Sequence, residues 1–324
     1  MNSNPVIDFH SHILVADVVE ETAAHNVYTG FGARTVQPPA GSRFDEVFKR
    51  MLDPALHLPD MDKAGVDAEV LLSTTVIQGS SWAPPERDLA LNACVNDEIA
   101  GWVDRDPERF VGSCTVPLQD LALAIPELER CVRGLGARVV QVPSHVGGRY
   151  LGHASLRPFW EAVRDLGIVA LLHPEGIADP WFQDYALWNS VGQPIEEAKA
   201  LSSMIYDGLL EAMPELVIVI AHGGGFLPHY FGRLDRNVHN MPHSARNLSK
   251  NPGEYLAQLY FDTCVYDPAV LAALVSRFGA DHLVMGADYP VGENDPVGFV
   301  RHANLPTEQE NLVLGRTAAR LLGR

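Results

Sequence analysis

The sequence predicts a distorted (β/α)₈ barrel, and three observations lead to that fold class. Eight short apolar runs rich in β-branched residues recur along the 324 residues, and most are continuous, as in parallel strands buried on both faces. Stretches with the apolar spacing of amphipathic helices lie between them. The chain lacks the GxGxxG fingerprint and the Walker motif, which argues against a doubly wound sheet. Strands that alternate with helices over this length are typical of a barrel.

The apolar runs give the expected strands in order: Val6–Phe9, Ala68–Leu72, Phe110–Val116, Arg138–Val142, Ile168–Leu172, Leu216–Ala221, Leu259–Asp262 and His282–Gly286. Several of the helical stretches begin with Pro in or near the first turn and with Asp or Ser before it, as helix starts do. We expect helices at Leu89–Val103, Leu121–Leu135, Leu156–Leu166, Pro194–Met213 and Pro268–Arg277.

Two long irregular regions interrupt this alternation. Asn26–Ser42, rich in Gly, Thr and Pro, predicts a loop region inserted after the first strand, and Trp181–Gln193 predicts a second loop. Long loops in a compact domain usually cover a site or reach another subunit. The chain has no repeat, low-complexity segment or linker, so we expect a single domain over residues 1–324.

Composition narrows the range of partners. With 24 basic and 41 acidic residues the formal net charge is −17, a surface that repels nucleic acid and anionic membranes. We expect no secretory signal and no membrane span, because the longest apolar runs are short. The four cysteines form no CxxC pair, which indicates reduced thiols in the core, so we expect a cytoplasmic protein.

Histidine and aspartate close several of the predicted strands. Strand one runs into His10 and His12, strand five into His173, strand six into His222 and strand eight into Asp288, while strand seven runs into Asp262. Each residue alone has a structural interpretation, as a solvated strand end, a core histidine or a turn aspartate. Because a barrel gathers its active site at the carboxyl ends of its strands, the recurrence predicts one shared site.

The chemistry of this set suits a divalent metal ion. His10 and His12, two apart on a strand, point to the same side, which leaves Phe9 and Ser11 facing the helices. With His173 and Asp288 they form three nitrogen ligands and one oxygen ligand, a set for Zn²⁺ that Mn²⁺ or Fe²⁺ would also fit. No bridging Lys or Glu follows strand four, so we expect one ion.

His222 is then free to act as a general acid or base near the ion. It opens the segment "HGGGF", whose glycines would also suit a phosphate loop or an esterase oxyanion loop. The chain has no GxSxG elbow, which argues against the esterase interpretation.

The sequence resembles the amidohydrolase superfamily, and more closely its aminocarboxymuconate-semialdehyde decarboxylase branch. The matching segments cover nearly the whole chain: "VIDFHSH", "LDPALHLPDMDKAGVDAEVL", "DPERFVGSCTVPLQD", "LLHP", "LVIVIAHGGGFLPHYFGRLD" and "HLVMGADYP". The resemblance implies one divalent ion, usually zinc, on His10, His12, His173 and Asp288, with His222 activating water or relaying a proton. It also implies a dimer in which Arg233 reaches the substrate carboxylate of a neighbouring subunit.

Some positions depart from the family pattern. The family's substrate-binding arginine matches Asp45 here. Arg43, two residues earlier, would bind the substrate carboxylate from a shifted position, unless the substrate lacks that group. Glu175 follows "HP" where an aromatic residue would fit better, and its carboxylate would orient the substrate or act as a second acid or base. Trp188, in the loop with Trp181 and Tyr185, would stack on a planar substrate. We therefore predict a decarboxylase of an aromatic or muconate-type acid whose catalytic residues are His222 and Asp288. The alternative is a hydrolase of C–C or amide bonds, or a hydratase, on the same scaffold.

Overall fold

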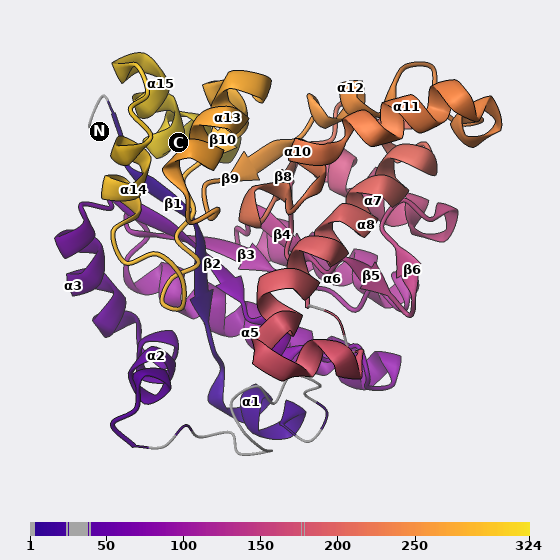
Figure 1. Ribbon diagram of the computed structural model, residues 1–324. Helices are drawn as coiled ribbons and strands as arrows, with labels where there is room; N and C mark the ends of the chain where they lie inside the picture. Colours follow the sequence, from indigo (N-terminus) through magenta and orange to yellow (C-terminus); the bar gives the residue numbers. More distant parts are fainter. Residues whose placement is uncertain (1–3, 24, 26–37, 39, 176, 178) are drawn as a thin grey trace.

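The computed structural model describes residues 4–23, 25, 38, 40–175, 177 and 179–324, and its centre is an eight-stranded parallel sheet (Figure 1). The strands in sheet order are β1 (Ile7–Ile13), β2 (Ala68–Ser73), β3 (Phe110–Cys114), β4 (Val139–Val142), β7 (Val169–Leu172), β8 (Ile218–Ile220), β9 (Tyr260–Asp262) and β10 (Leu283–Val284). Every neighbouring pair runs parallel. Sequence order and sheet order coincide, as in a (β/α)₈ barrel.

The sheet closes between its first and last strands through backbone hydrogen bonds. The Phe9 N–H donates to the Met285 carbonyl at 2.8 Å, and the His12 N–H donates to the Tyr289 carbonyl at 2.8 Å. The Tyr289 N–H donates back to His10 at 3.2 Å. The predicted fold is therefore confirmed, and it is distorted as expected, because β10 has only two residues.

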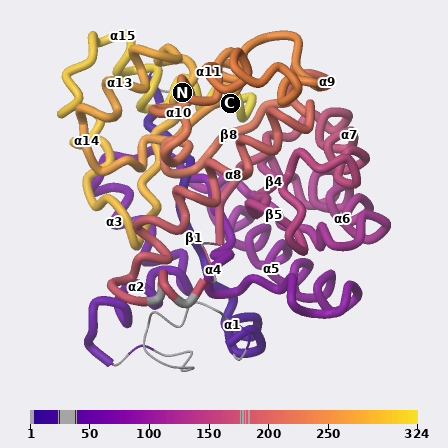
Figure 2. The backbone as a smooth tube through the Cα atoms, turned by 45° about the vertical axis from the view of Figure 1, so that its right-hand side comes forward, coloured from indigo at the N-terminus to yellow at the C-terminus, as the bar shows by residue number. Residues whose placement is uncertain are grey.

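Helices surround the barrel (Figures 1 and 2). Asp53, Asp120 and Asp267 each cap a helix by accepting a backbone hydrogen bond. The α-helices are α1 (Ala16–Thr22), α2 (Arg43–Leu52), α3 (Pro54–Ala64), α4 (Thr75–Gln78), α5 (Pro85–Arg105), α6 (Leu121–Gly134), α7 (Arg157–Leu166), α8 (Gln193–Tyr206), α9 (Leu209–Ala212), α10 (Leu227–Tyr230), α11 (Gly232–Asn240), α12 (Pro252–Leu256), α13 (Pro268–Phe278), α14 (Pro296–His302), α15 (Thr307–Asn311) and α16 (Thr317–Leu322).

A bulge in β1 changes which side chains enter the barrel. Asp8 pairs with Glu69 and Ser11 with Leu71, so β1 has one residue more than β2 over this stretch. Phe9 belongs to the same buried cluster as Val111 of β3 and residues of β7 and β8, strands that are not neighbours of β1, so this cluster fills the interior. The prediction that Phe9 faces the helices is therefore wrong, because the bulge interrupts the strict alternation on which it rested.

Several predicted boundaries also need correction. Trp181–Gln193 is not wholly irregular: Pro180–Ala186 forms 3₁₀ turns with a kink at Asp184 and Tyr185, and a π-helix covers Trp188–Gly192. Residues 194–213 form two helices, α8 and α9, because Gly208 adopts a left-handed conformation between them. Most of the loop predicted at Asn26–Ser42 lies outside the described residues, and the described part of the insertion after β1 folds into α1, α2 and α3.

Three smaller features complete the fold. An antiparallel hairpin, β5 (His145–Val146) and β6 (Arg149–Tyr150), follows β4. Short 3₁₀ helices cover Ala154–Leu156, His222–Gly224, Pro242–Ala245 and Ala280–His282, and a second π-helix covers Leu312–Arg316. All four cysteines are free thiols, and among the described residues no helix has both the length and the apolar character needed to cross a bilayer.

Candidate metal centre

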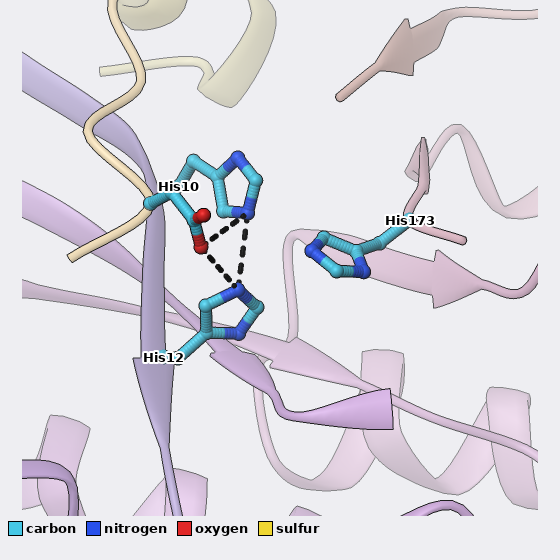
Figure 3. Close-up of side chains that lie close together, drawn as sticks. His10, His12 and His173 are labelled. Carbon is cyan, nitrogen blue, oxygen red and sulfur yellow. Dashed lines mark hydrogen bonds and ion pairs between the residues drawn. The ribbon is translucent and has the colours of Figure 1, made fainter. Parts of the chain in front are cut away.

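Four buried side chains from three parts of the barrel meet at the carboxyl ends of the strands. His10 and His12 lie on β1, His173 directly follows β7, and Asp288 lies four residues after β10. One ligand atom from each lies within 4.8 Å of the others. The His12 Nε2 is 3.1 Å from Asp288 Oδ1, and the His10 Nε2 is 3.5 Å from the same oxygen. Figure 3 shows the His10 and His12 rings on one strand with His173 across from them.

Each of His10, His12 and His173 has a hydrogen-bond partner at Nδ1, and this leaves the lone pair of each ring at Nε2, toward the shared site. The His12 Nδ1 lies 3.1 Å from the Ser73 carbonyl and the His173 Nδ1 lies 3.0 Å from the Pro174 carbonyl; a carbonyl only accepts, so both Nδ1 atoms carry the proton. The His10 Nδ1 likewise donates to Asp262 Oδ2 at 2.7 Å. Each Nε2 therefore presents a lone pair.

Such a set of donors calls for a cation. The Nε2 atoms of His10 and His12 are 3.1 Å apart and both act as acceptors, and a carboxylate oxygen lies beside them. Acceptors this close and this buried repel one another unless a positive ion lies between them. Outer partners that fix a histidine by its second nitrogen are the usual setting of metal-binding imidazoles. The residues therefore fit a divalent ion with three nitrogen ligands and one oxygen ligand.

The pKa shifts are consistent with ligands ready to bind. Burial lowers the pKa of His12, and burial together with the neighbouring histidines lowers the pKa of His173 well below its ordinary value. Burial alone would raise the pKa of Asp288, but the neighbouring histidines, His12 above all, lower it. Neutral imidazoles and an ionised carboxylate are the forms that coordinate a metal.

His222 lies beside this set and is held by a glutamate. Its Nδ1 is 2.5 Å from Oε1 of Glu197, which is fully buried on α8, and its Nε2 is 3.9 Å from Asp288 Oδ2. Burial lowers the pKa of His222, but Glu197, Asp288 and Asp262 outweigh burial and raise it to about 9. His222 is thus fixed in orientation next to the four converging side chains.

The glycines after His222 allow the backbone to turn tightly against its neighbours. His222, Gly223, Gly224 and Gly225 all have positive φ, between 50° and 79°. A Cβ on Gly225 would lie 2.5 Å from the Pro194 carbonyl and 2.7 Å from Glu197 Oε2. These glycines therefore serve a left-handed turn packed onto α8, which brings His222 to Glu197.

The predicted substrate-binding residues occupy different surroundings. Arg43 is exposed on α2, 3.3 Å from the Val291 carbonyl, and lines a cavity of about 770 Å³ that none of the four converging side chains lines. Glu175 lines a pocket of about 60 Å³ with Thr75 and Gln141, and burial raises its pKa to about 7. Trp188 is buried at the start of its π-helix, and Arg233 is exposed on α11.

Two carboxylates were missed by the sequence analysis. Asp262 orients His10 and also accepts hydrogen bonds from the backbone N–H groups of Gly223 and Cys264. Its place at the end of a strand was a usable signal. Glu197 lies in the first turns of a helix next to another glutamate, and no motif marks it.

Comparison with known proteins agrees with this geometry. The sequence profile of the amidohydrolase family matches residues 7–324. A 2-amino-3-carboxymuconate-6-semialdehyde decarboxylase from Dictyostelium discoideum is 34% identical over 289 residues, 87% of this chain and 80% of that protein. A 2-keto-4-carboxy-3-hexenedioate hydratase from a Sphingobium strain is 25% identical, over 87% of this chain and 82% of that protein.

Among solved structures, 5-carboxyvanillate decarboxylase LigW from Sphingomonas paucimobilis superposes with a TM-score of 0.89 at 27% identity, covering 99% of each chain. The family match therefore spans the strands that carry all four histidines and Asp288. This chain belongs to the amidohydrolase family.

Proposed function

We propose that this protein is a metal-dependent, non-oxidative decarboxylase of an aromatic or muconate-type carboxylic acid. The observation that carries the proposal is the convergence of three Nε2 lone pairs and the Asp288 carboxylate beside His222, which Glu197 holds. The names of its relatives, which include a carboxymuconate-semialdehyde and a carboxyvanillate decarboxylase, support this choice of reaction.

His10, His12, His173 and Asp288 would hold the ion. A divalent ion bound there supplies Lewis acidity and a template for substrate oxygens. The donor set favours zinc, and manganese or ferrous iron would also fit, since it includes no thiolate. Asp262 fixes the His10 ring, and the Ser73 carbonyl fixes the His12 ring.

His222 would supply the proton that the reaction consumes. When a carboxylate leaves as CO₂, the carbon it leaves must gain a proton, and His222 carries one within reach of the site. Glu197 accepts from Nδ1 and so directs Nε2 toward the substrate side, where Asp288 Oδ2 lies 3.9 Å away. Positioned proton transfer of this kind typically contributes roughly 10²- to 10⁴-fold to a rate.

Arginines from two subunits would bind the substrate. Arg43 and the Arg233 of a second copy would bind substrate carboxylates as charge-assisted pairs, which makes the working form a homodimer or a higher homo-oligomer. Glu175 and Trp188 would contact the rest of the substrate. We take residues 1–324 as one catalytic domain, and the four free thiols support a cytoplasmic setting.

A second candidate reaction is hydration, which one relative favours. The Sphingobium relative is named as a hydratase of a carboxyhexenedioate, and the same ion and His222 would serve addition of water to an enoate. Hydrolysis of a C–C or amide bond would use the same groups.

Product analysis separates these reactions. The metal-loaded protein is incubated with hydroxybenzoates, carboxymuconate semialdehydes and unsaturated dicarboxylates, and CO₂ release is measured beside mass analysis of each product. We expect CO₂ and loss of one carboxylate from an aromatic or muconate acid. Addition of water, or cleavage without CO₂, would instead establish the hydratase or the hydrolase. No turnover by the metal-loaded protein, with turnover by a related decarboxylase in the same assay, would contradict the decarboxylase proposal for these substrates.

A further inference from the structure

A second set of ligand atoms adjoins the first and shares one residue with it. His222, Cys264 and Asp288 each offer a ligand atom, and these three atoms also lie within 4.8 Å of one another. Cys264 follows β9 by two residues and is 3% exposed. Asp288 is therefore a member of both sets.

The Asp288 carboxylate faces both sets at once. Its Oδ1 lies 3.1 Å from His12 Nε2, and its Oδ2 lies 3.9 Å from His222 Nε2. A carboxylate placed in this way can give one oxygen to each of two ions, as in sites that bind two metals.

His222 is prepared for a ligand role by the same device as the other histidines. Its Nδ1 donates to Glu197 Oε1 at 2.5 Å, so the ring presents a lone pair at Nε2 once the proton on that nitrogen has left. A carboxylate behind a histidine is the common outer shell of a metal-binding imidazole. His222 and His10 share this arrangement, with Asp262 behind His10.

We infer that His222, Cys264 and Asp288 form a second, thiophilic metal site, which takes a soft divalent ion such as Cd²⁺, or Zn²⁺ in excess, next to the first ion. On binding, the Cys264 thiol and the protonated Nε2 of His222 each lose a proton to solvent, and the sulfur and the nitrogen bond the ion, with no change of oxidation state. The Tyr266 hydroxyl, 3.0 Å from the Cys264 sulfur, is placed to donate to the resulting thiolate. Thiolate ligands select softer ions, which separates this site from the first.

The second site has a consequence for the proposed reaction. An ion on His222 Nε2 occupies the lone pair through which that residue exchanges protons. The second ion is therefore inhibitory, whereas the first is required. The inference rests on the metal centre of the proposed function but not on its reaction.

The test measures Cd²⁺ binding by ultraviolet absorption, so it needs no substrate. The full-length protein is first loaded with one equivalent of Mn²⁺ and then titrated with Cd²⁺, while metal content and the ultraviolet charge-transfer band of a cadmium–thiolate bond are recorded. The matched variants are Cys264→Ser and Cys94→Ser, because Cys94 is the exposed free cysteine. His222→Asn removes the nitrogen ligand but keeps the thiol.

We expect two ions per chain and a strong thiolate band in the wild type and in Cys94→Ser. Cys264→Ser should lose the band, and both Cys264→Ser and His222→Asn should weaken binding of the second ion by at least the roughly 10- to 100-fold typical of losing an outer-shell partner. First-site occupancy should stay at one ion, which shows that these variants are folded. One Cd²⁺ per chain without the band, or a band that survives in Cys264→Ser and disappears in Cys94→Ser, would overturn the inference. Failure to load even the first ion would contradict the metal centre itself.

Discussion

The contact between His222 and Glu197 allows a sharp test of the proposed proton transfer. The substitution Glu197→Gln keeps the size of the side chain but removes its charge. The Nδ1–Oε1 distance is 2.5 Å and Glu197 is fully buried, so solvent cannot replace the lost interaction. A hydrogen bond to a charged group contributes about 1.5–3 kcal/mol, so kcat should fall roughly 10- to 150-fold.

The pH profile should change as well. Glu197 is the largest of the influences that raise the pKa of His222 to about 9. If protonated His222 donates the proton, activity falls as pH rises through this pKa. Glu197→Gln lowers that pKa, so the alkaline loss of activity should begin at lower pH. The assay is CO₂ release against pH on the substrate that the product analysis identifies.

The neighbouring glutamate provides the matched control. Glu196 is equally buried, but it accepts hydrogen bonds from Ser144, Tyr150 and Lys199 rather than from His222. Glu196→Gln should therefore keep the wild-type pH profile. In a His222→Asn protein, Glu197→Gln should cause no further loss of activity. The Glu197→Gln protein should also keep its full metal content. An unchanged alkaline limb in Glu197→Gln, or an equal shift in Glu196→Gln, would refute the reasoning.

Three further predictions concern the metal, the glycine turn and acid stability. Adding a divalent ion at 100 times its Kd should stabilise the wild type by about 2.7 kcal/mol, and His173→Ala should abolish most of the rise in Tm; an equal rise in the variant would remove His173 from the ligand set. Gly225 has φ +63°, and a Cβ on it would lie 2.5 Å from the Pro194 carbonyl, so Gly225→Ala should lower the free energy of unfolding in urea by about 1–3 kcal/mol. Gly101 lies inside α5 with open space around it, so Gly101→Ala should raise that free energy by about 0.5–1 kcal/mol. The reverse order would contradict the packing argument. In the metal-free protein, burial lowers the pKa values of His12 and His173 below their ordinary 6.5. The unfolded chain therefore binds more protons than the folded one, and the free energy of unfolding should fall as the pH drops through 6.5. A midpoint of urea unfolding that rises on acidification would contradict this prediction.

The sequence predicted most of the fold because barrel strands carry a strong local signal. The continuous apolar runs at Val169–Leu172 and Ile218–Ile220, flanked by helical stretches, indicate buried parallel strands. Their carboxyl ends lead to His173 and His222, so the site followed from the fold. The boundaries were less predictable, as at residues 181–193, where tertiary packing holds short 3₁₀ and π turns that no periodicity marks.

The bulge in β1 lies beyond what alternation can predict. An extra residue between Asp8 and Ser11 is set by the pairing of β1 with β2 and with the segment after β10. It explains how His10 and Phe9, adjacent in sequence, can both face the interior. The prediction that His10 and His12 lie together is confirmed, because these two residues keep their spacing of two, whereas the alternation fails at Phe9.

The sequence by itself therefore determined the barrel and the residue types at its strand ends, because both depend on local patterns of apolar and polar residues. Tertiary structure alone decided which partners complete the site. Glu197 meets His222 across 25 residues, and Asp262 meets His10 across 252. Contacts between distant segments leave no periodic trace in a single chain, and they assign each imidazole its tautomer. That assignment leaves His10, His12, His173 and Asp288 as a candidate site for a cation.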